Sequence, residues 1–278
     1  MKKEYDGYTV VPFPPVRKMT ADILELAHPK HMIHAFVEVD VTRARRLIRE
    51  YEAETGGDLS FTAFVLTCLG RAVARNKYMH AYRSGRNKLV LFDEVDVSTP
   101  IEIEMDGRKV PILHTIRATN ERTVRDISLE IRKVQAEGAK SASAPTTGGS
   151  RLLMNLPTFV RRFLMRTMLR NPHRAKEQRG TVALTAVGMF GEGGGWGLPL
   201  HQHTLGITLG GIAEKPVVVD GQIEIRERLS MTVSFDHDII DGAPAARFTQ
   251  LIFERAAQEG AVRQPGQRIV QRHMAHLL

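Results

Sequence analysis

The sequence predicts a mixed α/β fold of two layers, in which helices pack on one large sheet. Segments with a helical apolar period and segments of alternating apolar residues follow the order strand, helix, helix, strands, helix and then many strands. The 278 residues, 42% hydrophobic and 25% charged, are enough for one substantial core, and no internal repeat is evident. We therefore expect a single domain over residues 1–278.

In the first half of the chain, capping and turn residues separate the predicted elements. Asp40 and Ser60 can each cap the helix that follows, Thr123 with Asp126 starts another helix, and Gly138 ends it. The predicted helices cover residues 20–27, 41–51, 61–73 and 123–138. The predicted strands cover residues 33–39, 89–92, 95–105 and 110–116, and the last two form a hairpin.

The composition changes at residues 139–180, which we interpret as an atypical inserted loop followed by a basic helix. Residues 139–150 are rich in Ser, Ala, Thr and Gly and predict a flexible loop or linker. Residues 157–176 predict one helix with Arg162, Arg166 and Arg170 on one side and apolar side chains on the other. This helix can contact an anionic membrane or a partner; the alternative is a helix docked on its own domain or oligomer with its arginines in water.

The second half predicts strands and short turns. The predicted strands cover residues 181–187, 205–212, 216–219, 223–226 and 229–235, with a hairpin turn at Asp220-Gly221. The glycine-rich residues 188–197 lack both the Gly-x-Gly-x-x-Gly pattern and a Gly-Lys-Ser/Thr sequence. They therefore do not favour a dinucleotide-binding or phosphate-binding loop.

Charge and cysteine content limit the possible partners and compartments. The 39 basic and 31 acidic residues give a net charge of +8, which favours acidic partners, but no nucleic-acid recognition motif is present. The single cysteine, Cys68, excludes an intrachain disulfide and lies on the apolar face of the 61–73 helix, where we expect a core residue rather than a catalytic thiol. No apolar run is long enough to span a bilayer and the first residues are not a signal peptide, so we expect a cytoplasmic protein.

The stretch Leu229 to Phe248 contains the strongest candidate site. Alternating apolar residues predict a strand up to Phe235, the stretch from His237 to Gly242 predicts a loop, and a helix follows. A histidine at a strand end can act as a general base near neutral pH, and Gly242 permits a tight turn or a close approach. Asp241 can orient the loop or pair with a cation; a purely structural role for the histidine is the alternative.

Ser234-Phe-Asp-His-Asp-Ile-Ile-Asp-Gly-Ala243 closely resembles the active-site motif of the dihydrolipoyl acyltransferases, the core components of 2-oxoacid dehydrogenase complexes. Further stretches that resemble this family are Val16-Arg-Lys-Met, His34-Ala-Phe-Val-Glu-Val-Asp40, Leu91-Phe-Asp-Glu-Val-Asp-Val97 and Leu184-Thr-Ala-Val-Gly-Met-Phe-Gly191. The resemblance implies the fold shared with chloramphenicol acetyltransferase. It also implies a homotrimer, or a larger cage, with active sites between subunits.

The resemblance also implies roles for individual residues. His237 falls on the histidine that deprotonates the thiol of coenzyme A or dihydrolipoamide, and Thr185 falls on the family's oxyanion-stabilising serine. Asp241 is the aspartate of the motif, Gly242 follows it, and we suggest Arg17 as the partner of Asp241. Coenzyme A, as an acyl thioester, is then a substrate, and lipoamide would be supplied in trans by a lipoyl-bearing or other acyl-carrier protein.

Three positions depart from the family pattern. Asp238 stands where the family usually has arginine, Ala186 replaces an asparagine, and His80-Ala81 replaces Asn-Ala. The sequence also contains no recognisable lipoyl or subunit-binding domain. A non-catalytic scaffold that keeps the fold and docks a partner or membrane through residues 157–176 is therefore the alternative to an enzyme. His201 and His203 lack further ligands at metal-binding spacing, so we expect no metal.

Overall fold

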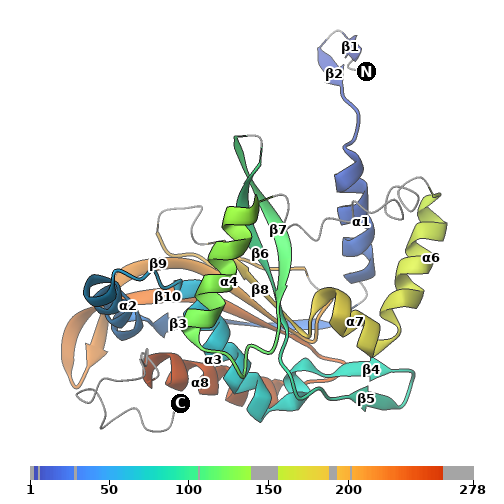
Figure 1. Ribbon diagram of the computed structural model, residues 1–278. Coiled ribbons are helices and arrows are strands. Elements are labelled where there is room, and N and C mark those ends of the chain that lie inside the picture. The colour runs from blue at the N-terminus through green and yellow to red at the C-terminus, as the bar shows by residue number, and fades with distance from the viewer. Residues whose placement is uncertain are drawn as a thin grey trace.

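The computed structural model describes residues 3–5, 7–27, 30–105, 107–138, 156–187, 193–200 and 202–258. Its centre is a six-stranded mixed sheet with the strand order β3-β10-β9-β8-β6-β7 (Figure 1). These strands are β3 (Met32–Asp40), β6 (Val97–Met105), β7 (Arg108–Ile116), β8 (Val182–Ala186), β9 (Leu205–Val219) and β10 (Gln222–Asp236). The predicted mixed α/β architecture is confirmed.

Strand β8 joins the two antiparallel halves of the sheet, because it runs parallel to both of its neighbours, β6 and β9. The four short strands predicted for residues 205–235 form instead two long strands, β9 and β10. Asp220 and Gly221 connect them with φ values of 49° and 79°, as a type I′ hairpin turn requires. The prediction of separate strands was wrong because Glu214–Pro216 and Glu227–Arg228 stay in the ladder despite their polar or proline residues.

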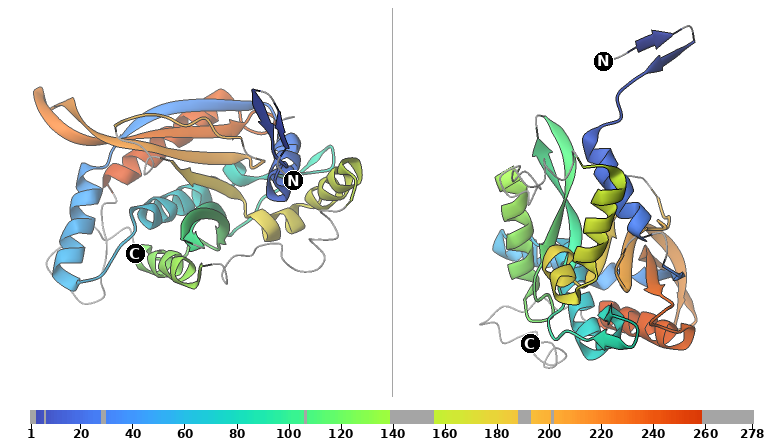
Figure 2. Two further views of the ribbon diagram at one scale, coloured as in Figure 1. Left: turned by 90° about the horizontal axis from the view of Figure 1, so that it is seen from above. Right: turned by 90° about the vertical axis from the view of Figure 1, so that its right-hand side faces the viewer.

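Four helices cover one face of the sheet: α2 (Thr42–Thr55), α3 (Phe61–Arg75), α4 (Val124–Glu137) and α8 (Gly242–Gln258) (Figure 2). Two of the predicted caps are present, since the Ser60 side chain accepts the Ala63 N–H and Thr123 and Asp126 form a capping box. The prediction of Asp40 as a cap was wrong, because Val41 is the N-cap residue of α2. Alternate residues of β10, such as Met231, Val233 and Phe235, are buried in the same core cluster as α3 and α8 residues.

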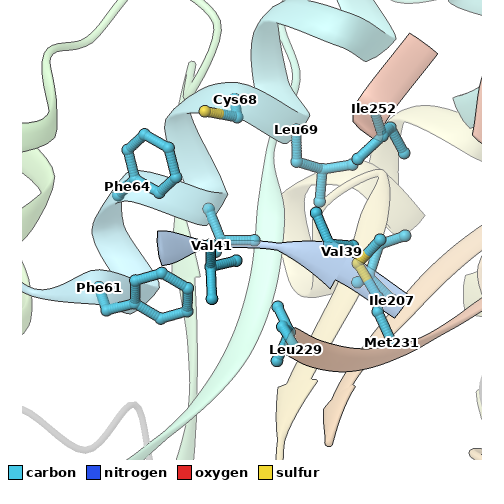
Figure 3. A pocket seen from close by; sticks show the side chains of 11 residues that line it. Val39, Val41, Phe61, Phe64, Cys68, Leu69, Ile207, Leu229, Met231 and Ile252 are labelled. Carbon is cyan, nitrogen blue, oxygen red and sulfur yellow. The ribbon is translucent and has the colours of Figure 1, made fainter. Parts of the chain in front are cut away.

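Cys68 lies within this apolar interior, as predicted. It borders a small cavity of about 20 Å³ between α3, α8 and the strands β3, β9 and β10 (Figure 3). The described residues that line the cavity are all apolar apart from the cysteine. The thiol is buried, which fits a packing role better than a catalytic one.

The basic segment 157–176 is not one helix, and this prediction is corrected. The structure has α6 (Thr158–Leu169) and α7 (Pro172–Arg179) with a break at residues 170–171. Pro172 cannot continue a helix, and the Asn171 side chain accepts the N–H groups of His173 and Arg174 as the cap of α7. Residues 139–155 lie outside the described part of the chain.

Helix α6 is docked beside α1 (Pro15–Ala27) (Figure 1). Arg161 is buried and forms an ion pair with the buried Asp22 of α1, and Arg162 Nε donates to the same carboxylate at 2.9 Å. Burial raises the pKa of Asp22, but the hydrogen bonds from Arg161 and Arg162 outweigh this effect and keep it below its usual value. Helix α6 is therefore anchored to its own chain.

The glycine-rich segment packs against the sheet. A Cβ at Gly210 would lie 1.8 Å from the Gly195 carbonyl oxygen, and a Cβ at Gly211 would lie 1.9 Å from that of Gly193. The glycines thus permit close contact between backbones rather than binding of a phosphate. Residues 188–192 lie outside the described part.

The remaining elements are small. They are β1 (Lys3–Tyr5), β2 (Tyr8–Val10), β4 (Tyr82–Ser84), β5 (Lys88–Val90) and a 3₁₀ turn at Lys77–His80. The β1–β2 hairpin stands away from the rest of the chain in Figure 1 and in the right-hand view of Figure 2. Of the helices in the described ranges, none is both long and apolar enough to cross a membrane.

Candidate active site

His237 lies directly after β10, where the chain leaves the sheet. Its backbone N–H donates to the His31 carbonyl at 2.7 Å, which fixes the backbone, while 44% of its side chain is exposed. The imidazole is therefore presented to solvent from a rigid strand end, as the strand-and-loop pattern predicted.

Asp236 organises this turn, and sequence reasoning missed it. It is almost fully buried, forms an ion pair with Lys30, and accepts the Asp238 N–H at 3.2 Å. Its carbonyl accepts the N–H groups of Ile239 and Ile240 at 3.0 Å. The available signal in the sequence was an acid at the end of an apolar strand, one residue before the histidine. Such a carboxylate becomes buried with the strand and therefore requires a partner.

Asp241 is close to His237 without being hydrogen-bonded to it. The His237 Nδ1 and Asp241 Oδ1 atoms are 3.8 Å apart, and 85% of the Asp241 side chain is exposed. Gly242 starts α8 without a positive φ, and a Cβ there would meet no atom within 4 Å. Neither a tight turn nor a close approach within one chain therefore requires this glycine.

Asp238, the negative residue beside the histidine, has two partners. His31 Nδ1 lies 2.9 Å from Asp238 Oδ1, and Arg83 Nη1 lies 3.4 Å from Oδ2. The hydrogen bond from His31 lowers the pKa of Asp238, so it is a carboxylate at neutral pH. Arg83 belongs to the β4–β5 hairpin, which together with Asp238 borders a hollow of about 400 Å³.

Thr185 lies on β8, in the wall of a larger cavity of about 840 Å³. It pairs with Thr208 of β9, which in turn pairs with Thr232 of β10. His237 lies five residues beyond Thr232. At about 3.3 Å per residue and about 4.8 Å per strand spacing, Thr185 and His237 are roughly 19 Å apart in one chain. A general base and an oxyanion donor must both lie within about 3 Å of the reacting groups, so one chain does not bring them together.

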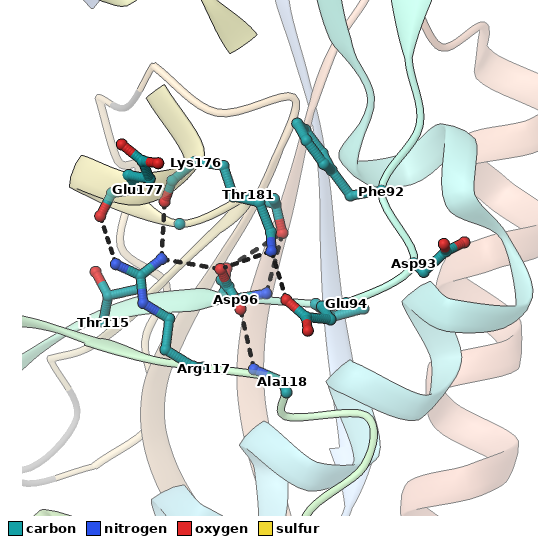
Figure 4. Close-up of polar contacts among 12 residues, drawn as sticks. Phe92, Asp93, Glu94, Asp96, Thr115, Arg117, Ala118, Lys176, Glu177 and Thr181 are labelled. Carbon is teal, nitrogen blue, oxygen red and sulfur yellow. Dashed lines mark hydrogen bonds and ion pairs between the residues drawn. The ribbon is translucent and has the colours of Figure 1, made fainter. Parts of the chain in front are cut away.

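A charge network around the buried Asp96 holds the start of β8 (Figure 4). Asp96 forms ion pairs with Arg117 at 2.9 Å and with Lys176 of α7 at 3.3 Å. Its carbonyl oxygen accepts the N–H groups of Thr181 and Val182 at 2.7 and 3.1 Å. Burial lowers the pKa of Lys176, but its bonds to Glu94 and Asp96 outweigh this effect and raise it overall. The sequence did not indicate this network, which fixes the strand that carries Thr185.

His80, one of the departures from the family pattern, is completely buried beside this network. Its Nε2 lies 3.1 Å from the Phe92 carbonyl oxygen and therefore carries the proton, so Nδ1 accepts from the Thr181 hydroxyl at 2.9 Å. Burial lowers the pKa of His80 to about 4. This histidine is neutral and structural.

The other candidate residues are not gathered at the site. Arg17 lies exposed on α1, and no ion pair joins it to Asp241 among the described residues. His203 Nε2 donates to the Arg179 carbonyl at 2.8 Å, while His201 lies outside the described residues. In the ranges that the structure describes, no group of three His, Cys, Asp or Glu side chains is placed to hold a metal ion.

The model of the 2-oxoacid dehydrogenases acyltransferase family (catalytic domain) matches the chain over residues 5–159 and 153–257. The chain belongs to this family. The resemblance seen in the His237 motif is thereby confirmed. The two matched stretches meet at residues 153–159, inside the segment predicted to be an insertion.

Individual relatives are distant. The lipoamide acyltransferase component of the branched-chain alpha-keto acid dehydrogenase complex of Bacillus subtilis (strain 168) is 24% identical over 253 residues, 87% of this chain and 50% of that protein. The chain thus spans about half the length of the curated relatives it matches.

Solved structures with the same fold include acyltransferase cores. A probable dihydrolipoamide acetyltransferase from Listeria monocytogenes 4b F2365 aligns over 93% of this chain and 99% of its own, with a TM-score of 0.68 and 20% identity. A truncated catalytic core of the 2-oxoacid dehydrogenase multienzyme complex from Thermoplasma acidophilum aligns over 91% of this chain and 99% of its own, with a TM-score of 0.65 and 18% identity.

Proposed function

We propose that the chain is a coenzyme A-dependent acyltransferase that moves an acyl group between coenzyme A and dihydrolipoamide or another thiol or hydroxyl acceptor. The observation that carries this proposal is the family match across residues 5–257, which includes the histidine motif at the exposed end of β10. The same match favours an enzyme over a scaffold that has only kept the fold.

In the proposed reaction, neutral His237 accepts the proton of the acceptor thiol. The thiolate attacks the carbonyl carbon of the acyl thioester, and the carbonyl oxygen becomes an oxyanion that accepts a hydrogen bond from the Thr185 hydroxyl. When the intermediate collapses, the bond from carbon to the leaving sulfur breaks and the imidazolium returns its proton to that sulfur. No oxidation or reduction occurs.

The roughly 19 Å between Thr185 and His237 within one chain supports a site shared between two copies. His237 would come from one copy and Thr185 from the cavity of its neighbour, in a homotrimer or a larger cage. Gly242, where a Cβ meets nothing in one chain, and the exposed Asp241 would then face the neighbouring copy. Arg17 as the partner of Asp241 would also act across this boundary.

The acyl donor is either a free coenzyme A thioester or a lipoyl-bearing or other acyl-carrier protein acting in trans. We propose a cytoplasmic location from the single cysteine, which fits a reducing compartment. Contact with a partner or membrane through residues 157–176 would use the exposed Phe159 and Phe163, because Arg161 is buried in its ion pair with Asp22.

A thiol-release assay with acyl-coenzyme A thioesters and a panel of acceptors including dihydrolipoamide tests the proposal. His237→Ala should lower kcat by about 10²–10⁴-fold, whereas His173→Ala, which changes an exposed histidine on α7, should leave it unchanged. Turnover that does not depend on His237, or no turnover with any pair of substrates, would contradict the proposed function.

A further inference from the structure

The cavity beside Thr185, which we call the α6 chamber, is large and has mostly apolar walls. Its volume is about 840 Å³, within the range of small-molecule sites. Helix α1, helix α6, strands β6 to β9 and the segment after residue 198 all contribute to it. Its apolar wall residues include Ile23, Leu24, Leu113, Met165, Met168 and Leu200.

Several polar residues in the wall are bonded to one another or to the backbone. Ser98 donates to the Arg179 carbonyl, the Arg179 guanidinium donates to the Gln202 side-chain oxygen, and Gln202 Nε2 donates to the Ile23 carbonyl at 2.7 Å. Among the described residues that line the chamber, Arg179 is the one that carries a full charge, and its guanidinium lies over the Tyr82 ring. The chamber therefore offers few polar groups to a ligand.

Helix α6 holds its place in the wall through charges outside the chamber. Asp22 and Arg161 are 1% and 6% exposed and form an ion pair between α1 and α6. This pair fixes the helix that carries Met165 and Met168. The flexible thioether side chains can adapt to chains of different length.

We propose that the α6 chamber binds the apolar acyl chain of the substrate, since its volume lies within the range of small-molecule sites. The inference rests on the proposed function. The Thr185 hydroxyl marks the position of the reacting carbonyl oxygen, and Ala183, two residues earlier on the same face of β8, also lines the chamber. The acyl chain that extends from this carbonyl carbon would lie in the chamber. A succinyl carboxylate would meet few partners there.

The test compares acetyl-, hexanoyl- and decanoyl-coenzyme A in the thiol-release assay with dihydrolipoamide. We expect kcat/KM to rise about fourfold for each methylene added up to hexanoyl, the factor for burying one methylene. Calorimetric binding to the His237→Ala protein should give the same order of affinities without turnover.

Variants of the chamber wall test where the acyl chain of the substrate binds. Ala183→Leu fills part of the chamber and should lower the decanoyl-to-acetyl ratio of kcat/KM at least tenfold, and Met168→Asp should do so from the opposite wall. The matched control is Phe163→Ala, which removes an apolar side chain from the same helix. The Phe163 side chain is 65% exposed and does not line the chamber. It should leave the ratio unchanged.

The outcomes separate the two proposals. Chain-length-dependent binding without turnover by the wild type would reject the proposed function and keep the chamber assignment. Equal kcat/KM for acetyl and decanoyl thioesters would reject the chamber assignment and keep the function. A chain-length preference that neither Ala183→Leu nor Met168→Asp changes would place the acyl chain elsewhere. If Ala183→Leu does not fold, Met168→Asp alone decides, because Met168 is partly exposed and tolerates substitution.

Discussion

Two inactive variants should restore activity when they assemble together. Thr185→Val removes the hydroxyl and keeps the β-branched shape, which should cost about 10²–10³-fold in kcat, while His237→Ala should cost about 10²–10⁴-fold. If each site takes His237 from one copy and Thr185 from another, a mixed oligomer contains some sites in which both residues are intact.

The expected recovery follows from the geometry. Within one chain the two residues are roughly 19 Å apart, far beyond hydrogen-bond reach through a single substrate atom. In any closed ring assembled at random from equal amounts of the two variants, about one quarter of the sites join an intact histidine to an intact threonine, by the statistics of a closed symmetric ring. The activity of the unfractionated co-expressed protein should therefore rise to about a quarter of the wild-type value, and that of mixed trimers freed of both homotrimers to about a third.

The assay is co-expression of the two variants with different affinity tags, sequential purification of mixed oligomers, and thiol release normalised to protein. Each variant purified alone and then mixed without exchange of subunits is the control and should stay inactive. Mixed oligomers with no more activity than the separate variants would refute the shared site and require His237 and Thr185 to act within one chain.

Three further changes test the fold around the site by chemical denaturation. The pKa of His80 is about 4 in the folded protein and about 6.5 in the unfolded chain, so the unfolded state binds a proton first as the pH falls. About 3 kcal/mol of folding stability should therefore be lost between pH 6.5 and pH 4. A His80→Gln protein should not show this loss. Gly180→Ala should destabilise the protein by about 1–3 kcal/mol more than Gly85→Ala. Both glycines have a positive φ, but only a Cβ at position 180 would clash, because it would lie 2.6 Å from the Asp96 carbonyl oxygen. Equal losses of stability would mean that backbone strain alone acts. Thr232→Val should stabilise by about 1 kcal/mol because the Thr232 hydroxyl is buried without a partner among the described residues, and a loss of stability would reveal a hidden partner.

Local signals in the sequence predicted most elements and several of their ends. The capping box at Thr123 and Asp126, the Ser60 cap and the Asp220-Gly221 turn depend on residues within a few positions of each other. The histidine at the end of β10 was predictable for the same reason, since strand alternation stops at Phe235. The break at Pro172 was also readable from the sequence, because proline cannot continue a helix and Asn171 before it is a favoured cap residue.

Contacts between distant segments were not predictable. Asp22 and Arg161 are 139 positions apart, and Lys30 and Asp236 are 206 apart. No local pattern distinguishes Asp22 from an exposed acid on a helix, nor Arg161 from its exposed neighbours. The separation of Thr185 from His237 likewise depends on strand order, because β9 lies between their strands. Only the sheet register decides that the two cannot meet within one chain.

The reversed charge at Asp238 need not exclude an anionic substrate from the site. The family's arginine is absent there, but Arg83 lies 3.4 Å from the Asp238 carboxylate, and Arg86 and Lys88 border the same hollow. Because Asp238 stays ionised and neutralises only part of this charge, the surface beside His237 keeps an excess of cations. These cations belong to the β4–β5 hairpin. Under the proposed function, the phosphates of coenzyme A would be attracted to these cations, and Asp238 would hold Arg83 in place rather than repel the substrate.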